Sequence, residues 1–173
     1  MDLSNKEWQK KIQKILRPRI FLKVLRGKRL VADYDFGEVV TTEKLVNVVL
    51  KEDSGYDIRF ITAVINSPVP SFYVEKALFS DTTETSRVMD ADYSGPIPIP
   101  KSVTQLEQKR IIELVKKMPS LNKRLNEIGD KRTDERQRIE EEIKKTGAEI
   151  DESVYELYGI TKSEKRIIED SFG

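Results

Sequence analysis

The chain has 173 residues, which is enough for one domain with a hydrophobic core or for a domain with a helical appendage. It contains no histidine and no cysteine, which excludes disulfides and thiolate chemistry and removes a base or a ligand from the familiar serine, cysteine and zinc mechanisms. The net charge is +1, but residues 1–30 hold ten Lys or Arg against two acidic residues, so a basic surface can form locally.

The first fifty residues predict a helix followed by a small antiparallel sheet. Apolar residues at helical spacing predict a helix over 4–16, which Pro18 ends. Two strand-like runs, 19–26 and 29–35, are separated by Gly27-Lys28, which indicates a hairpin, and a third run covers 45–50.

The middle of the chain predicts short helices and irregular segments. A helix begins near Ile58 and stops at Asn66-Ser67-Pro68, and a second one covers 71–79. Residues 80–95 are polar and predict a loop. The alternating prolines of 97–100 indicate an extended edge segment.

The C-terminal part predicts helices. A capping box at Thr104 and Glu107 opens a helix that Pro119 would kink or break, and a charged helix follows over 133–145. A further helix ends at Gly159, and Thr161 caps the last one. One face of the helix before Gly159 is apolar and must be buried; it carries Ile150, Val154, Leu157 and Tyr158.

These elements predict an α+β fold with a small antiparallel or mixed sheet, short helices and a C-terminal helical region. We expect residues 1–100 to form the α+β domain and residues 101–173 to form helices that pack back on it. There is no apolar run of membrane-spanning length and no apolar core of a signal peptide. We therefore expect a soluble cytoplasmic protein without a membrane partner.

The most informative candidate site is the basic hairpin. Six cations fall within thirteen positions, where they could contact DNA phosphates and, from arginine, base edges: Arg17, Arg19, Lys23, Arg26, Lys28 and Arg29. The same pattern is also typical of a solvated sheet face with lysines on an edge strand. Arg87, in the polar loop, has the same two interpretations.

Other classes of function stay open from the residues alone. A metal-dependent nuclease could use Asp33 and Asp35 with Glu43-Lys44, although acidic residues at strand ends are commonly turn and cap residues. The helical region could instead dock a protein partner, with no role for DNA. Tyr155 and Tyr158 lie at helical spacing beside Ile150, which favours core positions over base stacking.

Several stretches resemble a known family. Glu149 to Glu164, with its Val-Tyr-Glu-Leu-Tyr-Gly, is similar to the ending of DNA adenine methyltransferases and type IIG restriction-modification enzymes. Five further stretches resemble, in order, the TaqI-like C-terminal specificity domain of those enzymes: residues 17–22, 29–32, 61–73, 97–100 and 108–115.

The resemblance implies a target recognition domain that binds double-stranded DNA together with a methyltransferase domain or subunit. It also implies DNA contacts for the basic hairpin and for Arg87. The glycine motif for the cofactor and the Asn/Asp-Pro-Pro-Tyr catalytic motif are both missing, so the chain itself would use no cofactor. The parent enzyme would use S-adenosylmethionine, and magnesium if it cleaves. The chain would be either the C-terminal piece of that enzyme or a free-standing specificity module.

Overall fold

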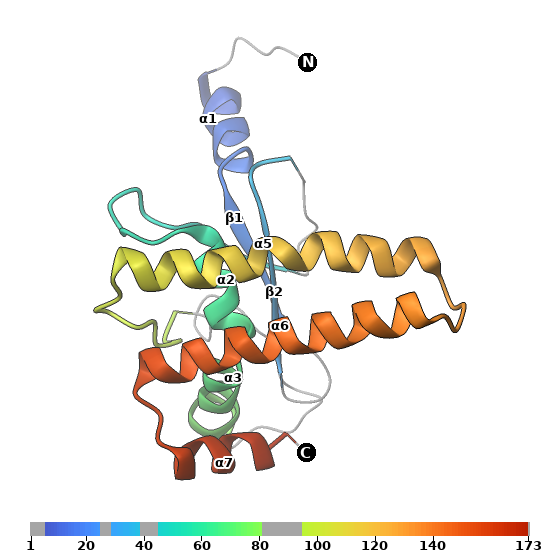
Figure 1. Cartoon of the computed structure of the whole chain (residues 1–173). Helices are drawn as coiled ribbons and strands as arrows, with labels where there is room; N and C mark the ends of the chain where they lie inside the picture. The colour runs from blue at the N-terminus through green and yellow to red at the C-terminus, as the bar shows by residue number, and fades with distance from the viewer. Residues whose placement is uncertain (1–5, 25–28, 39–44, 81–94, 173) are drawn as a thin grey trace.

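The computed structural model describes residues 6–24, 29–38, 45–80 and 95–172. Helix α1 (Lys6–Ile15) projects away from the body of the molecule, and strands β1 (Arg19–Val24), β2 (Leu30–Asp35) and β3 (Val46–Val48) follow it (Figure 1). The strands form an antiparallel sheet in the order β2-β1-β3. The predicted hairpin, the small sheet and the α+β class are confirmed, and the third strand is shorter than predicted.

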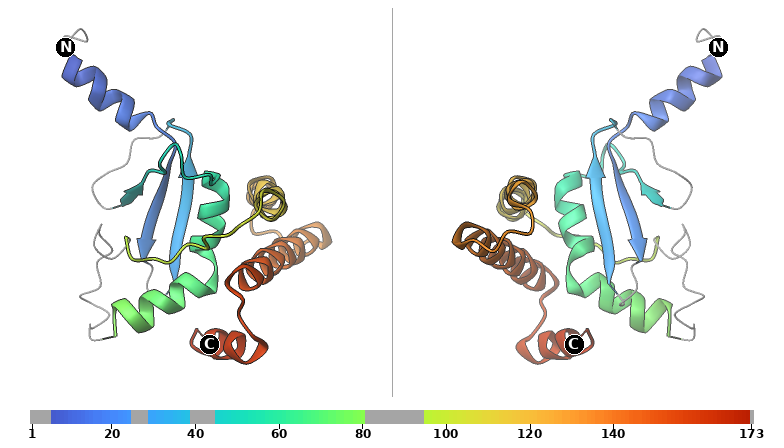
Figure 2. Two further views of the ribbon diagram at one scale, coloured as in Figure 1. Left: turned by 90° about the vertical axis from the view of Figure 1, so that its left-hand side faces the viewer. Right: turned by 90° about the vertical axis from the view of Figure 1, so that its right-hand side faces the viewer.

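The described helices cover one face of the sheet. Side chains alternate along the strands, so Ile20, Leu22, Leu30 and Ala32 share the inner face and are buried. Helix α2 (Ile58–Asn66) lies against this face, and the helical hairpin of the C-terminal region lies beyond α2 (Figure 2). The described part of the protein therefore has three layers, with α2 in the middle.

Helix α2 carries apolar residues around its circumference, and it packs against the sheet on one side and against α5 on the other. All of its residues from Ile58 to Ile65 except Arg59 are buried. The Asp57 carboxylate accepts a hydrogen bond from the Arg59 backbone N–H and caps the helix start. The helix ends at Asn66 before Ser67-Pro68, as the sequence predicts.

The next helix begins three residues earlier than predicted. Helix α3 (Pro68–Tyr73) continues into a π-helical turn, η1 (Val74–Leu78). Prolines at 68 and 70 are compatible with its first turn, because backbone N–H groups there have no partner within a helix. The sequence reading treated these prolines only as a helix stop.

Asn66 and Ser71 close the free edge of β2. The Asn66 side-chain amide accepts a hydrogen bond from the Ala32 N–H and donates one to the Ala32 carbonyl, both at 2.8 Å. Ser71 Oγ accepts a hydrogen bond from the Leu30 N–H at 3.0 Å. These contacts replace a neighbouring strand, because they satisfy backbone groups that would otherwise stay unpaired at the sheet edge.

The C-terminal region consists of α5 (Gln105–Ile128), α6 (Asp134–Tyr158) and α7 (Lys162–Asp170). The predicted capping boxes at Thr104 and Thr161 are confirmed. The structure describes no helix that is long and apolar enough to cross a membrane.

Two predictions about these helices are wrong. Pro119 does not break α5, which runs without interruption from Gln105 to Ile128 and buries Ile111 and Val115 in the core. The charged helix predicted over 133–145 and the helix that ends at Gly159 are one continuous helix, α6. Tertiary packing of its buried face outweighs the low helix propensity of Gly147.

The two parts of the chain share one core. Ile111, Val115, Ile150 and Val154 from the helical region join the buried residues of the sheet and of α2. A second cluster, formed by Val69, Tyr155 and Ile168, joins α3, α6 and α7. The core position predicted for Tyr155 is confirmed, since its side chain is 2% exposed, and the half-buried Tyr158 donates a hydrogen bond to the Pro98 carbonyl.

Two glycines of the same helix should respond to alanine in opposite directions. Gly147 lies inside α6 with nothing near an added Cβ, so Gly147→Ala should raise the free energy of unfolding by about 0.5–1 kcal/mol. Gly159 ends α6 in the left-handed region, with φ at 65°, so Gly159→Ala should lower it by about 1 kcal/mol. Urea unfolding of both variants measures this, and equal signs would contradict the single-helix description of α6.

Replacement of Asn66 should open the sheet edge. Asn66→Ala leaves both backbone groups of Ala32 without a partner, so the free energy of unfolding should fall by about 1–3 kcal/mol. Asn122→Ala is the matched control, because the Asn122 amide is exposed and donates a hydrogen bond to the Met118 carbonyl of its own helix. An equal loss in both variants would show that the edge closure contributes no stability of its own.

Candidate nucleic-acid interface

The outer face of the sheet is the surface that the described helices leave open (Figure 2). Arg19, Phe21 and Lys23 point to this face from the central strand β1, by the alternation that buries Ile20 and Leu22. Their partners on β2 are, in the same order, Asp35, Asp33 and Val31. The face therefore mixes cations, carboxylates and apolar groups.

The structure does not gather the described cations of the predicted site on one exposed surface. Arg17 and Lys23 are exposed, close to opposite ends of β1. Arg19 is 7% exposed, and its guanidinium lies 5.5 Å from the centroid of the Phe21 ring. Arg29 is half-buried and points towards the helices. Arg26, Lys28 and Arg87 lie outside the described residues.

The two aspartates of β2 act as local backbone acceptors. Asp35 Oδ2 accepts hydrogen bonds from the N–H groups of Gly37 and Glu38, and Asp33 Oδ1 accepts one from the Tyr34 N–H. Glu43 and Lys44, the other residues of the nuclease alternative, lie outside the described residues. Within the described ranges, no group of three or more His, Cys, Asp or Glu side chains could hold a metal ion.

A hollow of about 370 Å³ lies at the end of the sheet where α1 joins β1. Its lining includes Arg17, Phe36 and Lys51. The Phe36 ring is 54% exposed and meets the Tyr34 ring edge-on at 5.7 Å. An exposed aromatic ring beside two cations could stack on a nucleic-acid base or sugar, and no local pattern in the sequence marks Phe36 for this role.

Arg59 closes one side of this aromatic group. Its guanidinium lies 5.9 Å from the Phe36 ring centroid and forms an ion pair with Asp57 at 2.6 Å. The hydrogen bond from Arg59 holds the pKa of the Asp57 carboxyl below its ordinary value. The ion pair with Asp57 therefore holds the Arg59 side chain at the start of α2.

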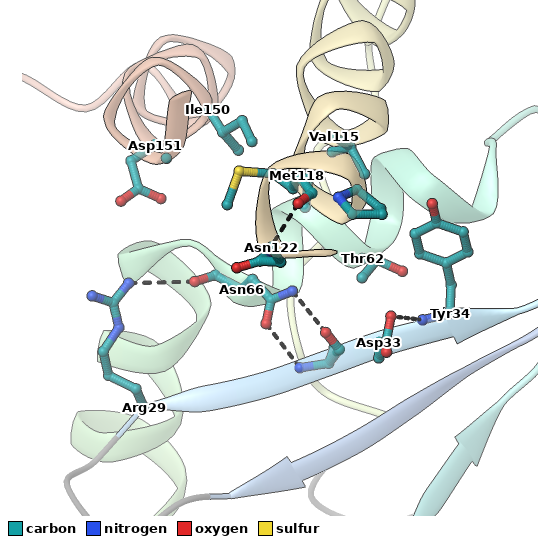
Figure 3. A pocket seen from close by; sticks show the side chains of 14 residues that line it. Arg29, Asp33, Tyr34, Thr62, Asn66, Val115, Met118, Asn122, Ile150 and Asp151 are labelled. Atoms are coloured by element: carbon teal, nitrogen blue, oxygen red, sulfur yellow. Dashed lines mark hydrogen bonds between the residues drawn. The ribbon is translucent and has the colours of Figure 1, made fainter. Parts of the chain in front are cut away.

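A second cavity, of about 520 Å³, lies between β2, α2, α5 and α6 (Figure 3). Arg29 and Asp151 lie on one side of it, and Asn66, Asn122 and Met118 also line it. Arg29 Nη2 donates a hydrogen bond to the Asn66 carbonyl at 3.3 Å. The hairpin base thus contacts the end of α2 through one of the cations predicted to bind DNA.

The Asp151 carboxyl is partly buried. Its pKa is raised to about 6, mainly by burial and to a smaller extent by the Glu169 carboxylate, while the charges of Arg29 and Lys165 offset only part of the increase. The charged form of Asp151 therefore costs folding free energy at neutral pH, even with Arg29 facing it.

A family model matches the segment of the chain that forms the sheet. The model of the TaqI-like C-terminal specificity domain matches residues 2–99. The chain belongs to this family. No curated protein and no solved structure matches it.

The TaqI-like match covers the sheet, α1, α2, α3, η1 and the extended segment to Ile99. Helices α5, α6 and α7 lie beyond it, although they supply part of the same core. The outer face of the sheet and the Phe36 hollow lie wholly within the matched segment, whereas the Arg29 cavity has one wall inside the match and one outside.

Asp151→Asn should change how stability depends on pH. Because the folded pKa is about 6 and the unfolded value is near 3.8, the folded state of the unmodified protein binds more protons between these values. Its stability should therefore fall as pH rises from about 4 to about 6, and Asp151→Asn should remove that fall. At pH 7.5 the variant should be more stable by about 1–2 kcal/mol, a value reduced for partial solvent exposure.

Thermal unfolding at pH 4.5, 5.5 and 7.5 measures this effect. Asp53→Asn, which replaces an exposed turn carboxylate, is the matched control and should leave the slope in place. An Asp151→Asn variant with the parent slope would show that Asp151 is well solvated in the folded protein.

Proposed function

We propose that the chain recognises double-stranded DNA sequence-specifically, as the specificity part of a restriction-modification enzyme. Membership of the TaqI-like specificity family is the observation that carries this proposal. The enzyme would be a DNA adenine methyltransferase, with or without endonuclease activity, and its methyltransferase domain or subunit would be the protein partner. The chain itself would be non-catalytic; S-adenosylmethionine, and magnesium if the enzyme cleaves, would bind in the rest of it.

The open face of the sheet supports this proposal physically. Arg17 and Lys23 are exposed and six residues apart, so roughly 20 Å of extended chain separates them. That length spans several phosphates along one DNA strand. Arg26 and Lys28 follow Lys23 closely in the sequence, and Phe36 supplies an exposed ring near Arg17.

The proposal divides the predicted site residues into two roles. Arg17, Lys23, Arg26 and Lys28 contact DNA phosphates, and Arg87 contacts bases or a groove. Arg19, buried beside Phe21, supports β1 instead, since a side chain that is 7% exposed has little surface to offer a phosphate. Arg29 is given no phosphate contact, because it is half-buried and its guanidinium lies 5.5 Å from the Phe172 ring centroid.

Charge reversal of the proposed phosphate contacts should abolish binding. In fluorescence anisotropy with a labelled duplex that contains the parent enzyme's site, Lys23→Glu, Arg26→Glu and Lys28→Glu combined should weaken affinity by at least about 100-fold at low salt. The slope of log affinity against log salt should also become shallower by about 3, because three phosphate contacts are lost.

A charge-matched control separates a local contact from a general effect of net charge. Arg138→Glu, Lys144→Glu and Lys145→Glu combined reverse the same number of exposed cations on α6, a helix of the third layer, and should leave DNA binding nearly unchanged. If the unmodified chain bound no duplex at low salt, alone or with its methyltransferase partner, the proposed function would be wrong.

A further inference from the structure

Phe36 is a large apolar side chain that stays 54% exposed in the folded protein. It directly follows β2, and its ring lines the hollow of about 370 Å³ where α1 joins β1. Val49 lines the same hollow and is 46% exposed, and the exposed Pro18 adds to the apolar surface. Apolar surface that gathers at one corner of a molecule indicates a binding site, unlike single exposed residues that are scattered over the surface.

The backbone on both sides of Phe36 is held in one conformation. The carboxylate of Asp35 accepts hydrogen bonds from the N–H groups of Gly37 and Glu38 at 2.8 and 3.0 Å. Gly37 has φ at 100° and lies directly against the carbonyl of Leu16, where an added Cβ would collide. The turn that carries Phe36 is therefore fixed against the residue that follows α1.

Neighbouring side chains also hold the Phe36 ring. Tyr34 meets it edge-on, with 5.7 Å between the ring centroids and 77° between the ring planes. The Arg59 guanidinium lies 5.9 Å from the Phe36 centroid and is itself held by the ion pair with Asp57 at 2.6 Å. A ring that is already fixed loses little conformational entropy on binding, so the surface that it buries against a ligand contributes to affinity.

Two exposed cations line the same hollow as the ring. Arg17 comes from the residues before β1, and Lys51 comes from the segment between β3 and α2. Of the two carboxylates in the lining, Asp57 forms the ion pair with Arg59, and Glu52 is exposed. An apolar ring beside two cations complements a nucleotide of a DNA strand, because its apolar sugar lies between two phosphates.

We propose that the Phe36 ring packs against the deoxyribose of one nucleotide of the bound duplex, while Arg17 and Lys51 contact the phosphates on either side of that sugar. The inference rests on the proposed function and adds Phe36 and Lys51 to its contacts. The sugar is the partner because the bases of a duplex are stacked on one another, which leaves the deoxyribose carbons as accessible apolar surface. Contacts to sugar and phosphate position a protein on the duplex and carry no sequence information.

Fluorescence anisotropy of the full chain with two labelled duplexes tests this contact. One duplex contains the parent enzyme's site, and the other has the same composition with the site scrambled. Phe36→Ala should weaken affinity for both by roughly five- to twentyfold with an unchanged salt slope, because apolar contact is lost and no phosphate contact is removed. Phe36→Tyr keeps the ring and should stay within about twofold of the unmodified chain.

Lys51 and a second exposed apolar residue complete the test. Lys51→Gln should weaken binding to both duplexes and make the slope of log affinity against log salt shallower by about 1. Leu106→Ala is the matched control, because this side chain on α5 is 77% exposed and lies away from the hollow, and it should leave affinity unchanged.

The sugar contact and the proposed function fail in different ways. If the unmodified chain bound the duplexes and Phe36→Ala bound them equally well, the sugar contact would be wrong and the proposed function would stand. A loss confined to the duplex with the site would indicate a base contact and would also overturn the sugar contact. So would a Phe36→Ala variant that lost only its methyltransferase partner, since the hollow would then dock protein. An unmodified chain that bound neither duplex would overturn both proposals.

Discussion

The burial of helix α2 is the constraint on which the rest of the structure depends. A three-stranded sheet has too little surface to form a core alone, and α2 is apolar on all sides, so each needs the other and α2 needs a second cover. Helices α5 and α6 provide that cover through Ile111, Val115 and Val154. All the described helices that pack on the sheet therefore lie on one side of it.

The fold could be predicted where local chemistry decides it. The antiparallel pairing of β1 with β2, the two capping boxes and the helix end at Gly159 are confirmed, because each depends on residues within a few positions. Two predictions are wrong for the opposite reason: the helix break at Pro119 and the division of α6 into two helices near Gly147. Both residues disfavour helix locally, and contacts with a neighbouring helix, which are not visible in the local sequence, outweigh that preference.

The candidate site was less predictable than the fold. Clustering of cations in the sequence marks the hairpin as a candidate site, but it cannot say which side chains face solvent. The structure buries Arg19 beside Phe21 and turns Arg29 towards Asn66 and Phe172. The partners of Arg29 lie 37 and 143 positions away along the chain, beyond any local pattern. Asn66 was likewise read as part of a helix stop, although its amide closes a sheet edge.

The hydrophobic core contains residues from both sides of Ile99, where the segment matched by the family ends. This affects how segments could be exchanged between relatives. A chimera that transplants only the segment matched by the family would set a foreign α2 against resident Val115 and Val154, and a foreign Arg29 against resident Phe172. Mismatched shapes in such a close-packed interior lower stability, so a loss of function in such a chimera would not report on the transplanted segment alone. The unit to exchange is the sheet together with its C-terminal helices.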